Sequence, residues 1–222
     1  MTAFEAADDL VGSGHDFFAR SLARLTLDVP AALTDPTQTA VRGDLDLDPS
    51  LWEQMDVQPL RPAAVLIPVI DRPEPGVILT QRTSHLPNHP GQIAFPGGSI
   101  DPEDASPAAA ALREAQEEIG LDPQLVEPIG YIDLYLTFSG YRILPLVARV
   151  ATDYAMTLNA HEVEDAFEVP LAFLMDAQNH ALHSREWKGL MRRFYAMPYG
   201  DRYIWGVTAG ILRNLYERIY ES

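Results

Sequence analysis

The stretch GGSIDPEDASPAAAALREAQEEIGL, residues 97–121, decides how this chain folds, because it joins a glycine loop to a helix with legible ends. Ser106 is a favoured N-cap residue, and Pro107 suits the first helical position. Alanines at 108–111 are strong helix formers, and Gly120 suits the position just past a helix end. These residues predict a helix over 107–119.

Three carboxylates lie in the C-terminal half of this predicted helix, at Glu114, Glu117 and Glu118. At about 100° per residue, Glu118 lies roughly 40° to one side of Glu114 and Glu117 about 60° to the other. All three acids therefore face one way. The apolar residues expected to pack on the core from the opposite flank are Ala108, Leu112, Ala115 and Ile119.

A solvated helix face would explain an ordinary run of acids, but it explains these acids poorly. Glu117 and Glu118 occupy the last turn, where the helix dipole disfavours negative charge. Two carboxylates about 4 Å apart repel by roughly 4 kcal/mol at an effective dielectric of about 20, and a divalent cation reverses that repulsion. Mg²⁺ prefers oxygen ligands and often binds carboxylates together with substrate phosphates. The pattern favours a divalent-metal site.

Residues 113–121, REAQEEIGL, resemble the second half of the Nudix signature, R-E-U-x-E-E-x-G-U with U aliphatic. The first half differs, because Asp104 stands where the family has Glu and Arg113 comes one residue late, which weakens any role for Asp104. The strands and helices of the chain favour an α/β fold, and the resemblance implies an α/β/α sandwich around a mixed sheet. It also implies Mg²⁺ or Mn²⁺ held by Glu114, Glu117, Glu118 and the carbonyl group of Gly97.

Residues 79–98, LTQRTSHLPNHPGQIAFPGG, resemble the upstream motif of the coenzyme A pyrophosphatase subfamily, L-L-T-x-R-x-x-x-L-x-x-H-x-G-x-x-x-F-P-G-G. The longer loop after Gly98, with its acidic residues, is also similar to that subfamily. The resemblance implies substrate contacts from Arg82, His89 and Gln92. For the histidine, a structural place in the loop is an equal alternative.

The catalytic residues predicted around the metal are Arg113, Glu117 and Glu162. Arg113 precedes Glu117 by four residues and can orient that carboxylate across one helical turn. The acids at 162, 164 and 168 most simply form a solvated stretch. Nudix enzymes often recruit a further carboxylate from a loop beyond the helix, and on that resemblance Glu162 is the first choice. Glu117 or Glu162 would bind a second metal or accept the proton of the attacking water.

Composition describes a chain of 222 residues that can bury one substantial core, since 47% of the residues are hydrophobic. No apolar run reaches the roughly 18 residues of a membrane span, and residues 1–9 are acidic, unlike a signal peptide, which predicts a cytoplasmic protein. The absence of cysteine excludes disulfides and thiolate chemistry. A net charge of −16 argues against nucleic acid or an anionic membrane as partner.

The chain divides into an N-terminal extension at 1–58 and a Nudix hydrolase domain at 59–222. Within the extension, residues 16–25 predict an amphipathic helix that buries Phe17, Phe18, Leu22 and Leu25. Strand–turn–strand patterns occur at 62–81 and at 129–150. Residues 205–220 predict a closing helix, whose inward residues are Ile211, Leu212, Leu215 and Ile219.

These features predict hydrolysis of the pyrophosphate linkage in coenzyme A and its thioesters. The products would be adenosine 3′,5′-bisphosphate and 4′-phosphopantetheine or its acyl form. Two alternatives stay open: a Nudix enzyme acting on another nucleoside diphosphate derivative such as ADP-ribose or NADH, and a Nudix-fold module that binds a nucleotide without turnover. The oligomeric state is also open, with a homodimer as one alternative.

Overall fold

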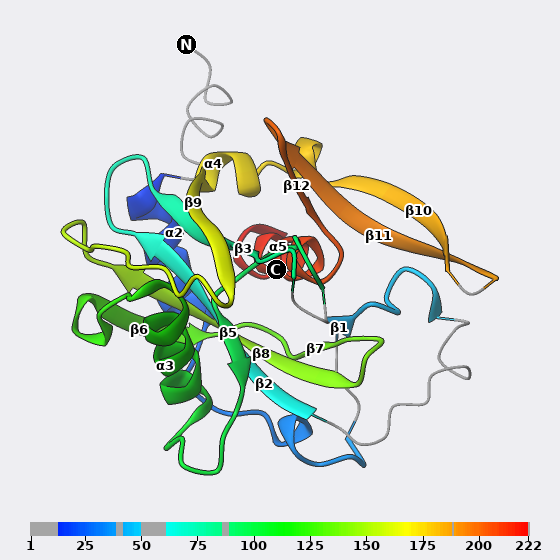
Figure 1. Ribbon diagram of the computed structural model, residues 1–222, viewed down its shortest axis with the longest axis horizontal. Helices are drawn as coiled ribbons and strands as arrows, with labels where there is room; N and C mark the ends of the chain where they lie inside the picture. Colours follow the sequence, from blue (N-terminus) through cyan, green and yellow to red (C-terminus); the bar gives the residue numbers. More distant parts are fainter. Residues whose placement is uncertain (1–12, 39–41, 50–60, 86–88, 188, 222) are drawn as a thin grey trace.

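The structure, a computed structural model, describes residues 13–38, 42–49, 61–85, 89–187 and 189–221. Its strands form two sheets, a nine-stranded mixed sheet and a three-stranded antiparallel sheet beside it (Figure 1). The domain boundary predicted at 58–59 lies outside the described residues, so the division of the chain stays a prediction.

Strand β2, Arg61–Ile70, is the central strand of the large sheet and is buried on both faces. It pairs in parallel with β8, Tyr141–Val150, along its full length, and antiparallel with β5, Gly97–Ser99. Leu66 packs into the core on one face of the sheet, and Ile67 packs into the core on the other. A strand buried on both faces has a continuous apolar sequence, as residues 62–70 do.

The large sheet runs β1-β7-β8-β2-β3-β4, and the off-path strands β5, β6 and β9 pair with β2, β8 and β3. Both predicted strand patterns are confirmed as strands. The second is also confirmed as an antiparallel hairpin, because β7 and β8 pair on either side of the turn at 139–140, although residues 129–138 contribute to two strands, β6 and β7, instead of one. The first differs from a simple hairpin. β2 and β3 meet only at Val69 and Val77, while β3 pairs along its length with β9. The remaining bounds are β1 Arg42–Gly43, β3 Gly76–Arg82, β4 Ile93–Ala94, β6 Val126–Tyr131, β7 Tyr135–Leu136 and β9 Val163–Pro170.

Helices cover both faces of the large sheet, which confirms the predicted α/β/α sandwich. Helix α3, Pro107–Ile119, packs on the core that contains Leu66, whereas α2, Gly14–Arg24, and α5, Val207–Tyr216, pack on the core that contains Ile67. No helix among the described residues is long and apolar enough to cross a membrane. The short helical segments are η1 Ala31–Leu33, η3 Pro123–Leu125, α4 Leu171–Leu174, η4 Ala177–Asn179 and η5 Glu217–Glu221.

The prediction for the C-terminal helix is right about its packing and wrong about its start. Strand β12, Arg202–Trp205, ends where the helix was expected to begin, and Gly206, with φ of 65°, makes the turn into α5. The alternation of exposed Tyr203 with buried Ile204 is the strand signal in this segment. All four predicted inward residues of the helix are buried, namely Ile211, Leu212, Leu215 and Ile219.

The described part of the N-terminal segment belongs to the core. The predicted burial of Phe17, Phe18 and Leu25 is confirmed, but Leu22 is 59% exposed, so its predicted burial is wrong. The buried stripe of α2 consists of residues 14, 17, 18 and 21, and Leu22 lies about 90° from its centre. Ser21, which is fully buried, lies on this stripe in place of Leu22.

Arg142 of β8 attaches the next part of this segment to the sheet. Its buried guanidinium donates hydrogen bonds to the carbonyl oxygens of Ala32, Asp35 and Gln38, the last two at 2.8 and 2.9 Å. Three carbonyl oxygens accept from this buried cation, the charge of Asp35 acts on it as well, and its Nε has no hydrogen-bond acceptor among the described residues. The segment that follows α2 is therefore held against the sheet by Arg142 and by the burial of Leu33 in the core.

The three-stranded sheet was not predicted from the sequence. It consists of β10, Ala181–Trp187, β11, Leu190–Tyr199, and β12, all antiparallel. Arg202 attaches it to the large sheet, donating to Gln81 Oε1 at 2.6 Å and to Asp165 Oδ2 at 2.5 Å. At the start of α5, Thr208 Oγ1 donates to the carbonyl oxygen of Ile93 in β4 at 2.9 Å.

We expect Phe17→Ala to destabilise the protein by about 3–5 kcal/mol, because it removes a fully buried ring and leaves a cavity between α2 and the sheet. Leu22→Ala on the same helix should change the free energy of unfolding by less than about 0.5 kcal/mol, since that side chain is exposed. Equilibrium unfolding in urea measures both. Equal effects would mean that α2 is not part of the folded core.

Candidate active site

Helix α3 begins and ends where the sequence predicts. Ser106 Oγ accepts a hydrogen bond from the backbone N–H of Ala109 at 3.1 Å, and Pro107 is the first helical residue. Gly120 closes the helix in the left-handed conformation with φ of 68°. The acidic residues thus occupy the expected turns of the expected helix.

The buried face of α3 differs from the predicted one. Ala115 and Ile119 are buried as expected, but Ala108 and Leu112 are only partly buried. Glu118 is 4% exposed, so the expectation that all three acids face away from the packed side is wrong for this residue. The reason is tertiary: α3 packs against both β2 and β5, and the second contact covers the flank that carries Glu118.

Two glycines let β5 approach β2 on one side and α3 on the other. Gly97 has φ of 150°, and a Cβ atom there would lie 2.5 Å from the carbonyl oxygen of Ala64. A Cβ atom on Gly98 would lie 2.5 Å from the carboxylate of Glu114. The backbone N–H of Gly97 donates to Glu118 Oε2 at 3.2 Å. The loop therefore lies directly on two of the predicted metal ligands.

Burial dominates the electrostatics of Glu118. It raises the pKa of this carboxyl from 4.5 to about 7, against the opposing effect of the hydrogen bond from Gly97. The charge of Glu114 raises this pKa further and that of Arg82 lowers it. In the absence of bound cations, the helix holds a carboxyl group that resists ionisation at neutral pH.

Glu114 and Glu162 belong to the same electrostatic cluster. Burial raises the pKa of Glu114, partly offset by its hydrogen bond with Arg113. The charge of Glu162 raises the pKa of both Glu114 and Glu118, although Glu162 is far from them in sequence. The backbone N–H of Thr83 donates to the carbonyl oxygen of Glu162 at 3.0 Å, which holds this residue beside the end of β3.

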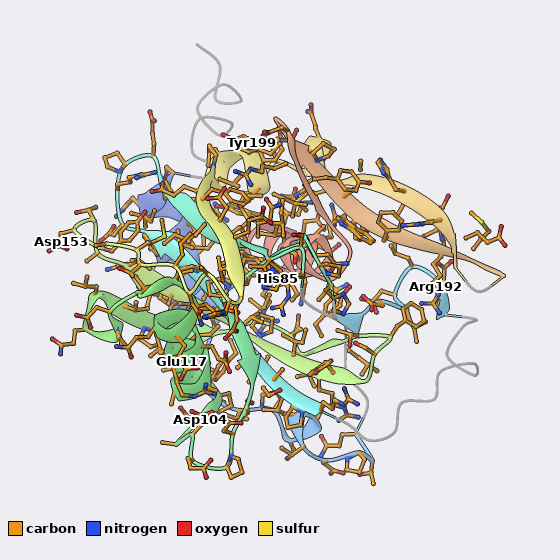
Figure 2. All side chains as sticks on the ribbon, in the orientation of Figure 1. His85, Asp104, Glu117, Asp153, Arg192 and Tyr199 are labelled. Atoms are coloured by element: carbon orange, nitrogen blue, oxygen red, sulfur yellow. The ribbon has the colours of Figure 1, made fainter. Side chains whose placement is uncertain are left out.

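Arg113 organises the exposed side of the site. Its Nη1 donates to Glu114 Oε1 at 3.0 Å and to Glu117 Oε2 at 3.2 Å. Its Nε and Nη2 donate to the two carboxylate oxygens of Asp104, each at 3.0 Å. Figure 2 shows Asp104 and Glu117 at the same end of the molecule, in the loop before α3 and on α3 itself. The side chain of Glu117 is 57% exposed.

Asp104 is the site residue whose importance the sequence reasoning underestimated. Its paired hydrogen bonds with Arg113 lower its pKa, and its Oδ2 also accepts from the backbone N–H of Asp101 at 2.8 Å. The extra residue in the loop moves the acid along the chain, but the loop folds so that the carboxylate still reaches the arginine. The sequence feature that could have indicated this contact is an acidic loop directly before a helix that carries Arg113.

The predicted substrate residues lie around the end of β3. Arg82 Nη1 is 4.0 Å from Glu118 Oε1, and the backbone N–H of Arg82 donates to the carbonyl oxygen of Gln92 at 2.9 Å. His89 is exposed, with φ of 55°, and its carbonyl oxygen accepts from the N–H of Gln92 at 3.3 Å. Arg82 is thus next to the acidic cluster, whereas His89 shapes the loop beside it.

The side chains fit a hard divalent cation by their chemistry, although they are not gathered into a finished site. Among the described residues, no three His, Asp or Glu side chains stand close enough together to hold a metal ion. Glu114, Glu118 and Glu162 nevertheless repel one another electrostatically. A cation among these oxygens would relieve that repulsion, and its binding would favour the ionised form of Glu118.

Comparison with known proteins gives one family. A model of the NUDIX domain matches residues 59–189. An uncharacterized Nudix hydrolase NudL from Shigella flexneri is 42% identical over 167 residues, which cover 74% of this chain and 87% of the relative. The protein of the same name from Escherichia coli K12 is 43% identical over 155 residues, covering 70% and 81%. A solved Nudix hydrolase from Alicyclobacillus acidocaldarius is 19% identical, with a TM-score of 0.45, and covers 73% of this chain and 94% of its own.

Glu118→Gln should stabilise the metal-free protein at pH 8 by up to about 3 kcal/mol, because ionising the buried carboxyl of the wild type costs folding energy. Because folding raises this pKa, the wild type has its full stability below pH 4.5, where the carboxyl is protonated in both the folded and the unfolded chain. That contribution is lost as the pH rises through about 7. The two proteins should therefore have equal stability near pH 4.5. Thermal melts across this pH range, with chelator present, measure the difference.

Glu117→Gln is the matched control, since the side chain of Glu117 is 57% exposed and its replacement should not give the gain in stability at pH 8 that is expected of Glu118→Gln. With Mg²⁺ or Mn²⁺ added, Glu118→Gln should lose turnover by a factor of about 100 or more and should show a smaller stabilisation by metal. A less stable metal-free variant that keeps its activity would contradict a ligand role for Glu118.

Proposed function

The chain belongs to the Nudix family and is a pyrophosphohydrolase of that family, and from this premise we propose that it cleaves the pyrophosphate linkage of coenzyme A and its thioesters. The products are adenosine 3′,5′-bisphosphate and 4′-phosphopantetheine or acyl-4′-phosphopantetheine. One observation carries the choice of substrate. Arg82, from the segment that resembles the coenzyme A pyrophosphatase motif, lies 4.0 Å from Glu118 of the acidic cluster.

This proximity gives the segment at 79–98 a role in choosing the substrate. A substrate bound through its diphosphate at Glu114 and Glu118 would meet Arg82 and the loop that contains His89 and Gln92. An arginine binds phosphate oxygens in two parallel hydrogen bonds, so Arg82 can leave Glu118 and hold one side of the diphosphate. The resemblance of this segment to one subfamily supports that subfamily's substrate over ADP-ribose or NADH.

The proposed cofactor is Mg²⁺ or Mn²⁺, with Glu114, Glu118, Glu117 and the carbonyl group of Gly97 as candidate ligands. When bound, the metal neutralises diphosphate charge and lowers the pKa of water. Arg113 keeps Glu114 and Glu117 oriented through its two hydrogen bonds from Nη1. Since phosphoryl transfer asks for little covalent chemistry from the protein, positioning and charge neutralisation supply most of the catalysis.

A carboxylate must accept the proton of the attacking water. Glu162 is the stronger candidate, because its charge acts on both Glu114 and Glu118 and its Oε1 is oriented by a hydrogen bond from Asn159 Nδ2 at 3.2 Å. Glu117 is the alternative, although its hydrogen bond from Arg113 holds its side chain on the exposed side of the helix. Cytoplasmic location and a homodimer complete the proposal.

Purified protein should cleave coenzyme A only when Mg²⁺ or Mn²⁺ is present, since the carboxylates cannot neutralise a diphosphate by themselves. Chromatography of the reaction should give the two phosphate products named above. Parallel assays with ADP-ribose and NADH measure the specificity constants. A much larger kcat/KM for either of these would overturn the substrate, and no turnover of any of the three with bound nucleotide would favour a non-catalytic module.

Arg82→Ala should raise KM for coenzyme A by about tenfold, because it removes a charged contact to the diphosphate. His89→Ala should give a smaller increase. Metal affinity of both variants, followed by the metal-induced shift in Tm, should stay close to that of the wild type. His15→Ala, an exposed histidine on α2, is the matched control. If both test variants have wild-type kinetics, Arg82 and His89 do not contact the substrate and serve only the structure of the loop.

A further inference from the structure

The three-stranded sheet carries an open cavity of about 460 Å³ that the proposed chemistry does not use. Its wall is mainly aromatic and includes one guanidinium, and the lining residues are His183, Ser184, Arg185, Phe194, Tyr203 and Trp205. Two contacts organise the rings. Phe194 and Trp205 have centroids 5.3 Å apart, and His183 Nδ1 is 2.7 Å from the hydroxyl oxygen of Tyr203.

Strand register explains why these rings share one face. His183 of β10 pairs with Phe194 of β11, and Ala196 of β11 pairs with Trp205 of β12, so their side chains point to the same side of the sheet. Residues of the alternate parity, such as Met197 and Ile204, are buried in the core with α5. The aromatic face is therefore turned away from that core, and Tyr203 is 42% exposed.

The same face carries two arginines directly opposite each other. Arg185 pairs with Arg192, one position beyond the His183 and Phe194 pair on this side of the sheet. Like charges directly opposed across strands are destabilising. Neither guanidinium has an ion-pair partner within 4 Å among the described residues, and the buried Nε of Arg192 has no hydrogen-bond acceptor there. Arg192 stacks 3.8 Å from the ring centroid of Phe138, and its charge opposes the burial that raises the pKa of Asp44.

A bound anion would neutralise the repulsion between these two arginines. Such a basic pair is unusual in so acidic a chain. The whole sequence holds only 16 Lys and Arg against 32 Asp and Glu. Two opposed arginines without an ion-pair partner within 4 Å among the described residues favour a ligand with a compact negative charge, and guanidinium groups bind phosphate in paired hydrogen bonds. Figure 2 places Arg192 toward the end of the hairpin distant from Tyr199, so the charged end and the aromatic end follow one another along β11.

The cavity is connected to the acidic cluster through β4. Trp205 precedes Gly206 and α5, and Thr208 of α5 donates to the carbonyl oxygen of Ile93. The neighbouring carbonyl oxygen, that of Gln92, accepts from the N–H of Arg82, whose guanidinium reaches Glu118. Hydrogen bonds thus run from the start of α5, next to Trp205, through β4 to the end of β3, where Arg82 lies.

We propose that this face binds the nucleotide half of the substrate, an inference that rests on the function proposed above. The purine ring stacks among Phe194, Tyr203 and Trp205, and a phosphate on its ribose lies between Arg185 and Arg192. Two residues along a strand span about 7 Å, which is comparable with the separation of a base from its ribose phosphate. The face thereby distinguishes a nucleotide that carries this additional phosphate from one that does not.

Isothermal titration with adenosine 3′,5′-bisphosphate, in chelator and with the full chain, tests the inference without relying on turnover. Trp205→Leu should weaken binding by about tenfold through loss of stacking, and Arg185→Gln by a similar factor through loss of the phosphate contact. Adenosine as the probe should lose affinity in the first variant only. Leu182→Ala, an exposed apolar residue on the same strand, and Arg20→Gln on α2 are matched controls that should bind as the wild type does.

The kinetic result separates this inference from the proposed function. KM for coenzyme A should rise in Trp205→Leu and Arg185→Gln and stay unchanged in the two controls. If coenzyme A is hydrolysed but neither KM nor nucleotide affinity changes in the test variants, the subsite is wrong while the function stands. If coenzyme A is not hydrolysed, the function fails, and the titration alone decides whether the face binds a nucleotide. Tighter binding of a single-stranded oligonucleotide than of the bisphosphate would overturn the assignment as a substrate subsite.

Discussion

The close approach of β5 to β2 and α3 is the constraint on which the acidic site depends. Gly97 leaves no room for a Cβ atom against Ala64, and Gly98 leaves none against the carboxylate of Glu114. This approach brings the N–H of Gly97 to Glu118 and covers that side chain. A loop lying farther from the helix would leave Glu118 more exposed to water and would weaken the burial that raises its pKa.

This packing gives the acids on the two sides of α3 different electrostatic surroundings. On the exposed side, Arg113 donates hydrogen bonds to Asp104, Glu114 and Glu117. Acids that would otherwise repel one another therefore share one cation. On the covered side, Glu118 has the N–H of Gly97 and a distant contact with Arg82. Repulsion is therefore concentrated where the helix meets the loop, and a divalent cation gains most there. The dipole of the last turn adds to this repulsion without being the main cause, because burial is the larger effect.

Features fixed by local sequence could be predicted, and features fixed by tertiary packing could not. Ser106, Pro107 and Gly120 set the ends of α3 through caps that act within a few residues, so the helix was predicted correctly. Glu118 was expected to point outward, because the spacing along the helix does not reveal that β5 packs on its flank. Leu22 was misplaced for a similar reason, since helical spacing gives a stripe but not its centre. Trp205 was assigned to a helix because the two-residue alternation in β12 is too short to compete with the longer apolar pattern after it.

An acidic protein that takes a polyanionic substrate must separate attraction near the site from repulsion at long range. The net charge of −16 opposes approach, but that opposition is screened beyond about 8–10 Å at ordinary ionic strength. Contacts inside the site are screened much less, so the few arginines there outweigh many distant carboxylates. Arg82 lies 4.0 Å from Glu118 at the acidic cluster, and Arg185 and Arg192 on the aromatic face have no ion-pair partner within 4 Å among the described residues. Orientation of a bound nucleotide is thus governed by where these arginines lie, and the overall charge governs only how fast the nucleotide arrives.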